Sequence, residues 1–412
     1  MQIAEAFHHV VAGQDGVRFT AYDGSTAGPV DADIHVAIRS PRAVSYLVSS
    51  PGELGLARAY IAGEIDVDGE MYAALTRLSQ PSVTALSWAD RAEIARTLGP
   101  AALRRPPKPA QEVRLRGRRH SKGRDAQAIS HHYDVSNTFY EWLLGPSMAY
   151  TCAVFPRADA SLEEAQYEKH DLVARKLGLQ PGMRLLDVGC GWGGMVMHAA
   201  RHYGVQAIGV TLSRQQAEWA QKAIAEAGLS DLAEVRHMDY RDVREDGFDA
   251  VSSIGLTEHI GKAQLPAYFS FLQSKLRPQG RLLNHCIMRP TTTESVIKRR
   301  GFIHRYVFPD GELLGLGHIV SVMQNHGFEI RHEENLREHY AKTLTAWSAN
   351  LDDHWDEAVE EVGIGKSRVW RLYLAASRLG FETDRIQLHQ VLGVKLGPDA
   401  ASGMPLRPDW GS

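Results

Sequence analysis

The sequence has little cysteine, no long apolar run and almost no net charge, and each shortage excludes a class of protein. Its three cysteines form no C-x-x-C pair, which argues against a disulfide framework or a structural zinc site and favours a reducing cytoplasm. No window approaches about 18 uninterrupted apolar residues, and the first residues lack a signal-peptide pattern, so we expect no membrane span. A net charge of −3 argues against binding through bulk charge.

A metal site is not expected either. The chain has 19 histidines, but no H-x-x-x-H pair has a carboxylate close to it in the sequence.

The chain is long enough for two domains, since 412 residues exceed the usual size of one hydrophobic core. Residues 1–103 read as a small α/β accessory domain for lipid or dimer contact. Alternating residues predict strands over 17–22 and 34–38, and helical periodicity covers 41–48 and 55–61. We expect residues 128–412 to form the second, larger domain.

Residues 104–127 are basic and contain several prolines, so they predict a linker between the domains. A solvated tether is the simplest interpretation. A contact with anionic lipid head groups is the second, because each basic side chain near such a surface contributes about 1 kcal/mol. Nucleic acid is not expected as a partner, because no aromatic residues alternate with the charges as a stacking platform requires.

The second domain alternates strands and helices. This order predicts an α/β fold with a doubly wound, mostly parallel, Rossmann-like sheet, whose ligand edge is capped by a helical tail over about 291–394. The predicted strands are 184–188, 206–210, 233–237, 248–252 and 280–287, and the predicted helices are about 192–203, 213–227 and 263–276.

A glycine-rich turn follows the first of these strands and is the strongest single motif. Asp187 ends the strand, and Gly189, Gly191 and Gly193 follow at alternate positions. Glycines let the backbone approach a ligand closely, and the next helix offers free N–H groups at its start. The spacing D-x-G-x-G-x-G differs from the dinucleotide fingerprint, so it points first to S-adenosylmethionine, with NAD(P) or a purely structural turn as alternatives.

The ends of the next two strands supply further candidates for this cofactor. The second strand ends at Thr211, with Gln216 one turn into the next helix, where hydroxyl and amide groups can bond a ribose. The third ends at Asp239 and Tyr240, where an adenine would lie, although Asp239 could equally cap a turn.

Two more segments extend the pattern beyond a glycine turn, and with them the chain resembles the cyclopropane-fatty-acyl-phospholipid synthases and mycolic acid cyclopropane synthases. The resemblance runs over roughly residues 128–394. Its motifs are HHYDVSNTFY (131–140), MAYTCAVF (148–155), DVGCGWG (187–193), TLSRQQ (211–216), SIGLTEHIG (253–261), NHCI (284–287) and YAKTLTAW (340–347).

The resemblance implies roles for individual residues. The fold would be that of class I S-adenosylmethionine methyltransferases, with Tyr133, Tyr150 and Thr151 added to the cofactor pocket. A bound bicarbonate would contact Cys152, Glu258, His285, the backbone of Ile287, and Tyr340. The substrate would be an unsaturated phospholipid at the bilayer surface, reached by a cytoplasmic, peripherally membrane-associated and possibly homodimeric enzyme.

Each of these residues also has a simpler interpretation. A lone cysteine such as Cys152 is usually a small buried hydrophobe. Glu258 could begin a solvated helix, His285 could be a satisfied core histidine, and Tyr340 could serve packing alone.

The chain departs from the family pattern at a few positions. Thr257 replaces a phenylalanine, Thr151 replaces a serine, and Asn284 and Cys286 flank His285 where the family has leucine and threonine. An aromatic ring stabilises a nearby carbocation through its π face. We therefore expect a cyclopropane fatty acyl product, with a methylene- or methyl-branched chain from the same cation as the alternative. Two other functions are compatible with the sequence: a small-molecule methyltransferase, and a lipid-binding protein without catalysis.

Overall fold

Two compact units make up the chain, and each is described by itself. The computed structural model describes residues 2–10, 16–50, 52–78, 96, 105–113, 117, 119–125, 127, 136–293 and 301–411. Unit 1 comprises Met1–Arg114, Arg299–Val307 and His354–Leu379, and unit 2 comprises Leu115–Lys298, Phe308–Asp353 and Gly380–Ser412. The boundaries expected at residues 103 and 127 stay predictions.

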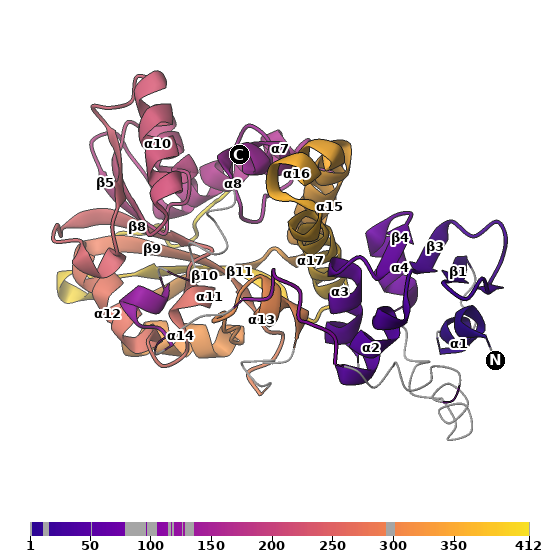
Figure 1. Ribbon diagram of the computed structural model, residues 1–412. Helices are drawn as coiled ribbons and strands as arrows, with labels where there is room; N and C mark the ends of the chain where they lie inside the picture. Colours follow the sequence, from indigo (N-terminus) through magenta and orange to yellow (C-terminus); the bar gives the residue numbers. More distant parts are fainter. Residues whose placement is uncertain are drawn as a thin grey trace. The chain divides into compact units, whose positions relative to one another are not determined.

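Unit 1 contains a four-stranded sheet with the strand order β2-β1-β3-β4. Strands β1, β3 and β4 are labelled in Figure 1. The core of unit 1 lies under alternating residues of β1 and β3, among them Phe19 and Val36, as the alternating pattern predicts. The strands are β1 (Val17–Ala21), β2 (Thr26–Ala27), β3 (Ile34–Ile38) and β4 (Ile65–Asp68). The helices are α1 (Ile3–Val10), α2 (Pro41–Ser49), α3 (Glu53–Ile61), α4 (Met71–Leu78), α13 (Phe302–Tyr306), α16 (Trp355–Val362) and most of α17 (Ile364–Glu382).

A buried ion pair ties the first part of the basic segment to α3. The Arg58 guanidinium donates to both carboxylate oxygens of Glu112, at 2.7 to 2.9 Å. Both residues are less than one-tenth exposed. A two-point contact of this kind is among the stronger charged hydrogen bonds.

Unit 2 is built on a seven-stranded sheet with the order β10-β11-β9-β8-β5-β6-β7. The five strands from β9 to β7 are parallel, which confirms the predicted alternation and fold class. The strands are β5 (Arg184–Val188), β6 (Gln206–Thr211), β7 (Ala233–His237), β8 (Phe248–Ile254), β9 (Leu276–Met288), β10 (Glu329–Asn335) and β11 (Gln387–Val394).

Helices cover both faces of this sheet (Figure 1). Leu185 of β5 belongs to the core beneath α8, α9 and α10, whereas the next residue, Leu186, belongs to the core beneath α12 and α14. The helices are α7 (Asn137–Leu144), α8 (Leu162–Leu177), α9 (Gly194–Tyr203), α10 (Arg214–Glu226), α11 (Thr257–Ile260), α12 (Leu265–Lys275), α14 (Leu316–Asn325) and α15 (Arg337–Asp353), with short 3-10 turns at Tyr240–Asp242 and Pro398–Ala400.

The tail differs from the expectation of a helical cap, because it also supplies two antiparallel strands. Strand β11 pairs with β9, and β10 pairs with β11 at the edge of the sheet. The sequence EIRHEEN of β10 is polar on both faces, as an edge strand tolerates, so its pattern does not signal a strand. In the described part of the chain, no helix is long and apolar enough to cross a bilayer.

We predict that Arg58→Met lowers the free energy of unfolding by about 3 kcal/mol, because it leaves the Glu112 carboxylate buried with weaker partners. Urea-induced unfolding measures the loss. The matched control is Arg77→Met, whose partner Asp33 lies at the surface. Its ion pair is solvated, so we expect a far smaller loss. Equal losses in the two variants would contradict this account.

Candidate active site

The glycine turn after β5 forms the first half of the site. Gly189, Gly191 and Gly193 all have positive φ, at 78°, 54° and 80°. The Gly189 and Cys190 N–H groups donate to the Val210 carbonyl, which anchors the turn to β6. A Cβ atom at Gly191 would meet no heavy atom within 4 Å, so this backbone borders open space. Gly193 is the N-cap of α9, and no described side chain makes a capping hydrogen bond there. The turn therefore fits a ligand that approaches the backbone closely.

Asp187 lies beneath this turn and is 2% exposed. Its carboxylate accepts a hydrogen bond of 2.6 Å from the Ser252 hydroxyl. Burial raises the pKa of Asp187 to about 6, against the Ser252 hydrogen bond and the Lys169 charge, which both lower it.

Lys169 of α8 is a buried cation that the sequence analysis did not single out. Its ammonium group donates to the Thr151 hydroxyl at 2.8 Å. Burial lowers the pKa of Lys169 to about 8. Its charge also acts on Cys152 and His285, so one cation reaches both parts of the predicted site.

The candidates at the ends of β6 and β7 are already paired within the protein. The Thr211 hydroxyl donates to the Gln216 side-chain oxygen at 2.8 Å. The Asp239 carboxylate caps the turn that begins at Tyr240 and accepts two hydrogen bonds from the Arg241 guanidinium. The structure thus shows Asp239 as a turn cap, which was its simpler interpretation. The Tyr240 ring packs edge-on against Tyr268, 5.2 Å between centroids.

Aromatic rings connect the two predicted halves. The Tyr150 ring lies 5.3 Å from that of Trp347, and Trp347 lies 6.1 Å from Tyr340. On the other side, Tyr140 contacts both Tyr150 and Trp192 of the glycine turn. Tyr133 lies outside the described residues.

Glu258 begins the second half, in the short helix α11. Its Oε1 accepts a hydrogen bond of 2.6 Å from the Ile287 N–H. The Ile287 backbone was expected to contact the bicarbonate, and here it contacts Glu258. Its Oε2 is buried and has no hydrogen-bond partner among the described residues. Burial raises the pKa of Glu258 to about 7.

His285 lies on β9 and is 1% exposed. Its Nδ1 lies 3.2 Å from the Gln390 amide nitrogen of β11. Its Nε2 is buried and finds no partner in the described part of the chain. Burial holds the pKa of His285 well below its usual range, aided by the positive charges of Lys169 and Lys176, so the ring is neutral.

Cys152 and Tyr340 meet at the same turn of chain. The fully buried Cys152 thiol lies 3.8 Å from the Leu336 carbonyl, and the Tyr340 N–H bonds that carbonyl at 3.1 Å. Burial raises the pKa of Cys152, so its sulfur stays a thiol.

Gly255 brings the two halves together. Its N–H donates to the His285 carbonyl, and its φ is 73°. A Cβ atom at this position would lie 2.9 Å from the Thr151 side chain. The cofactor side and the His285 side can approach this closely only because residue 255 lacks a side chain.

Three residues with contacts near the site were not predicted from the sequence: Lys169, Lys176 and Gln390. A signal for the two lysines was present, because they lie seven residues apart and share the buried face of α8 with Ala165 and Val173. No local pattern marks Gln390, because its contact with His285 depends on the pairing of β11 with β9.

No metal site emerges from the described residues. His198 approaches Asp171 at 3.4 Å and its ring lies near His202, but no group of three or more His, Cys, Asp or Glu could hold a metal ion there.

The mostly parallel sheet has the class I methyltransferase fold, and together with a family match over residues 120–391 it makes the chain an S-adenosylmethionine-dependent methyltransferase. The family model described as mycolic acid cyclopropane synthetase matches residues 120–391. The chain belongs to this family.

Individual relatives agree with that assignment. The chain is 55% identical over 425 residues to a probable fatty acid methyltransferase of Mycobacterium tuberculosis, covering 99% of this chain and 97% of that protein. It is 35% identical over 261 residues to the cyclopropane-fatty-acyl-phospholipid synthase of Escherichia coli K12, covering 63% and 66%. A solved mycolic acid cyclopropane synthase complexed with SAH and CTAB is 33% identical, with a TM-score of 0.62, covering 66% of this chain and 98% of that chain.

We predict that Glu258→Gln stabilises the protein above pH 7. The pKa of Glu258 is about 7 in the folded protein, against an ordinary value of 4.5. Between these values the folded protein binds more protons than the unfolded chain, so stability falls as the pH rises. The amide does not ionise, so above pH 7 it gains about 3 kcal/mol over the carboxylate.

Urea unfolding of both proteins from pH 4 to pH 8 measures this difference. The control is Glu245→Gln, which removes a carboxylate whose pKa is lowered, chiefly by its hydrogen bond from Arg236. That substitution should not stabilise the protein at any pH. A Glu258→Gln difference that does not vary with pH would contradict the predicted burial of an ionisable carboxyl.

Proposed function

We propose that the enzyme transfers a methylene group from S-adenosylmethionine to the cis double bond of an unsaturated phospholipid acyl chain, forming a cyclopropane. The observation that carries the proposal is that two buried atoms of this site, Glu258 Oε2 and His285 Nε2, have no hydrogen-bond partner among the residues that the structure describes. An unpartnered buried polar atom costs about 1–3 kcal/mol, so such atoms call for a ligand.

The reaction needs what these residues supply. An isolated alkene is a weak nucleophile, and its attack on the sulfonium methyl leaves a carbocation that must lose a proton. Bicarbonate, when bound, would supply the base for that proton. One carboxylate and one imidazole N–H fit such an ion, because Glu258 can accept its proton and His285 can donate to its oxygens. The buried Cys152, Tyr340 and Trp347 exclude water, which would quench the cation.

A methylene-branched product is the second candidate, and the departures from the family pattern favour it. The Thr257 hydroxyl donates to the Asn284 side-chain oxygen, and the Asn284 amide lies 3.3 Å from the Cys286 sulfur. All three side chains are buried. A polar group therefore stands where the family pattern has an aromatic ring, and a less stabilised cation can undergo a hydride shift before it loses a proton.

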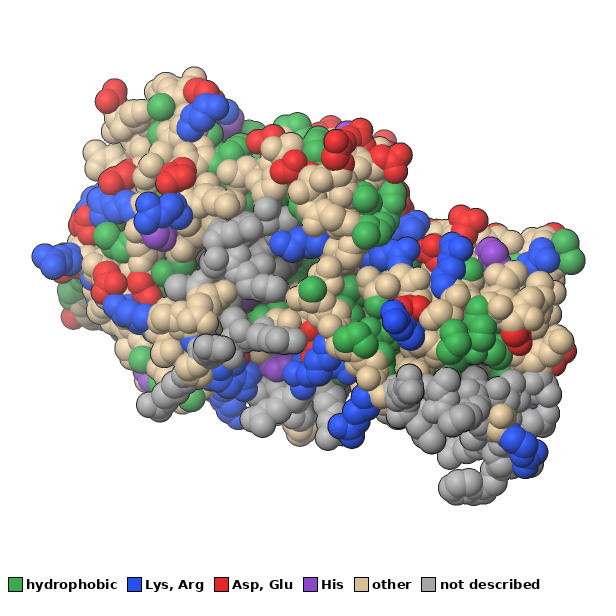
Figure 2. Space-filling view, viewed as in Figure 1, with side chains coloured by type: hydrophobic (Ala, Val, Ile, Leu, Met, Phe, Trp, Pro, Cys, Tyr) green, Lys and Arg blue, Asp and Glu red, His purple; other side chains and the backbone are tan. Residues whose placement is uncertain are grey.

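The phospholipid substrate requires contact with a bilayer, and the basic segment contributes less to it than its sequence suggests. Arg119 and Arg124 both bind the Asp310 carboxylate, and Lys122 contacts Asp242. Much of the segment's described charge is thus neutralised within unit 2. On the face seen in Figure 2, basic side chains lie among acidic ones. We therefore propose a peripheral contact that depends on the acyl chain as well as on charge.

The first test is methyl transfer itself. We predict that protein incubated with labelled S-adenosylmethionine and oleoyl phospholipid vesicles adds one CH₂ to the acyl chain, measured by mass spectrometry. Vesicles with saturated chains are the control. The rate should rise with pH through about 7 as the Glu258 carboxyl ionises. No mass gain would overturn the proposal, and methylation of a water-soluble acceptor instead would identify a small-molecule methyltransferase.

The second test concerns the fate of the cation. We predict that Thr257→Phe lowers the ratio of branched to cyclopropane product by about fivefold, because a cation–π contact contributes about 1 kcal/mol. Gas chromatography of the released acyl chains measures the ratio. Thr257→Val is the control, because it removes the hydroxyl without adding a ring. The same ratio in all three proteins would show that Thr257 does not control the product.

A further inference from the structure

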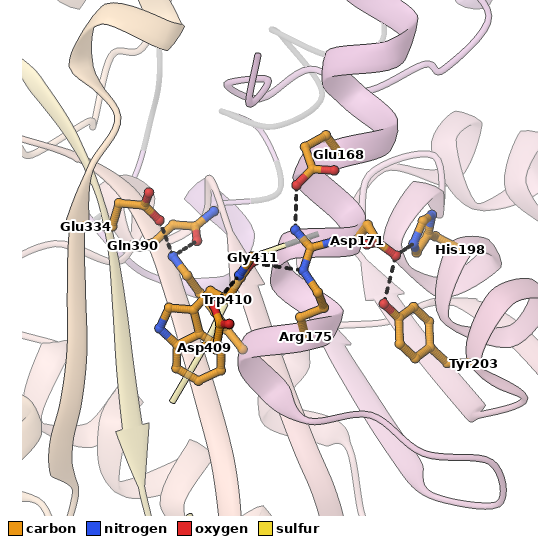
Figure 3. A network of polar contacts seen from close by, with 11 residues as sticks. Glu168, Asp171, Arg175, His198, Tyr203, Glu334, Gln390, Asp409, Trp410 and Gly411 are labelled. Carbon is orange, nitrogen blue, oxygen red and sulfur yellow. Dashed lines mark hydrogen bonds and ion pairs between the residues drawn. The ribbon is translucent and has the colours of Figure 1, made fainter. Parts of the chain in front are cut away.

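A chain of polar contacts runs from the buried face of α8 to His285. Lys176 is fully buried, and its ammonium donates to the Gln390 side-chain oxygen at 2.7 Å and to the Glu334 carboxylate. Figure 3 shows Glu334 and Gln390 converging on this group from neighbouring strands. The Gln390 amide nitrogen in turn lies 3.2 Å from His285 Nδ1.

Strand pairing fixes this arrangement. Gln390 of β11 is the direct partner of His285 on β9, so their side chains lie side by side on one face of the sheet. Leu283 and Leu392, each two residues from one of the pair, belong to the core beneath α8. The contact therefore faces the helix that carries Lys176.

The chemistry of the three groups sets the direction of each hydrogen bond. An ammonium group has donors and no acceptor, so Gln390 must present its oxygen to Lys176. Its NH₂ group then points to His285, and Nδ1 must accept. A neutral imidazole carries one proton, and an occupied acceptor at Nδ1 leaves that proton on Nε2.

We propose that Lys176 and Gln390 are positioning residues that hold His285 as the Nε2–H tautomer and thereby aim a hydrogen-bond donor at the anion site. This inference rests on the proposed function only for the identity of the anion. The opposite tautomer would set an N–H against the Gln390 NH₂ group and turn a bare nitrogen toward an anion. Because His285 is buried and neutral, it cannot resolve that conflict by taking up a second proton.

The tautomer can be measured directly, without substrate. Protein labelled with ¹⁵N-histidine gives separate nitrogen resonances for protonated and bare ring positions, and the His285 signals are identified by their loss in His285→Gln. We expect Nε2 protonated and Nδ1 bare. A protonated Nδ1, or an imidazolium, would overturn the proposal.

Gln390→Glu is the sharpest variant, because it keeps the size of the side chain and its contact with Lys176. A carboxylate only accepts, so His285 should switch to the Nδ1–H tautomer. Methyl transfer should fall about 10- to 100-fold in kcat, as activity does when a metal-bound histidine loses its orienting partner, while the KM for S-adenosylmethionine changes little.

The matched control is Gln387→Glu on the same strand. Gln387 contacts the Nε2 atom of His389, a histidine outside the proposed site. Its substitution should alter neither the His285 signals nor kcat.

Lys176→Met is the second variant, and it tests the chain of contacts from Lys176 through Gln390 to His285 if Gln390→Glu does not fold. Without the ammonium, the Gln390 amide can rotate, and His285 should show a mixture of tautomers with a partial loss of kcat. If either folded variant keeps the same single tautomer of His285, the proposed role of Lys176 and Gln390 is overturned. Failure of the proposed function would look different, because wild-type protein would then form no lipid product while its His285 tautomer stayed as predicted.

Discussion

The structure of unit 2 depends on one constraint, which is that two buried lysines on one face of α8 need hydrogen-bond acceptors. Lys169 and Lys176 are each no more than 1% exposed, and a buried ammonium is tolerated only where acceptors surround it. Lys169 finds the Thr151 hydroxyl, and Lys176 finds Gln390 and Glu334. In satisfying them, the chain brings the segment before α8 and strands β10 and β11 to the same helix.

Burial also sets the electrostatics of the site. Burial raises the pKa of Asp187 to about 6 and of Glu258 to about 7, while it lowers that of Lys169 to about 8. The charged form of each of these groups would be more stable in water, so the fold retains these groups at a cost in stability. Sites that keep unfavourable groups in this way are usually functional, because a proton acceptor works best with a pKa near the ambient pH.

Much of unit 2 could be predicted from the sequence, because alternating strands and helices with a glycine turn leave few topologies. The edge of the sheet could not, since β10 has no apolar face and the place of β11 between β10 and β9 is set by distant pairing. The same limit applies to the site. Cys152, Glu258 and His285 were predicted from motifs that resemble those of the family, whereas Gln390 acquires its proposed role only through its partner on β9. Thr257, Asn284 and Cys286 read as separate departures, yet they form one hydrogen-bonded group.

Strand β9 separates two tasks by the alternation of its side chains. His285 shares its face with Leu283, toward α8 and the Lys176–Gln390 contact, whereas Asn284 shares its face with Leu282 and Cys286, toward the core beneath α12. The departures from the family pattern at Asn284 and Cys286 therefore leave the partners of His285 untouched. They act instead through Thr257, which precedes Glu258 in α11. In the proposed reaction, one face of β9 orients the proton-handling groups, and the other changes the wall around the cation. Product outcome can then diverge within the family while the chemistry of proton removal stays the same.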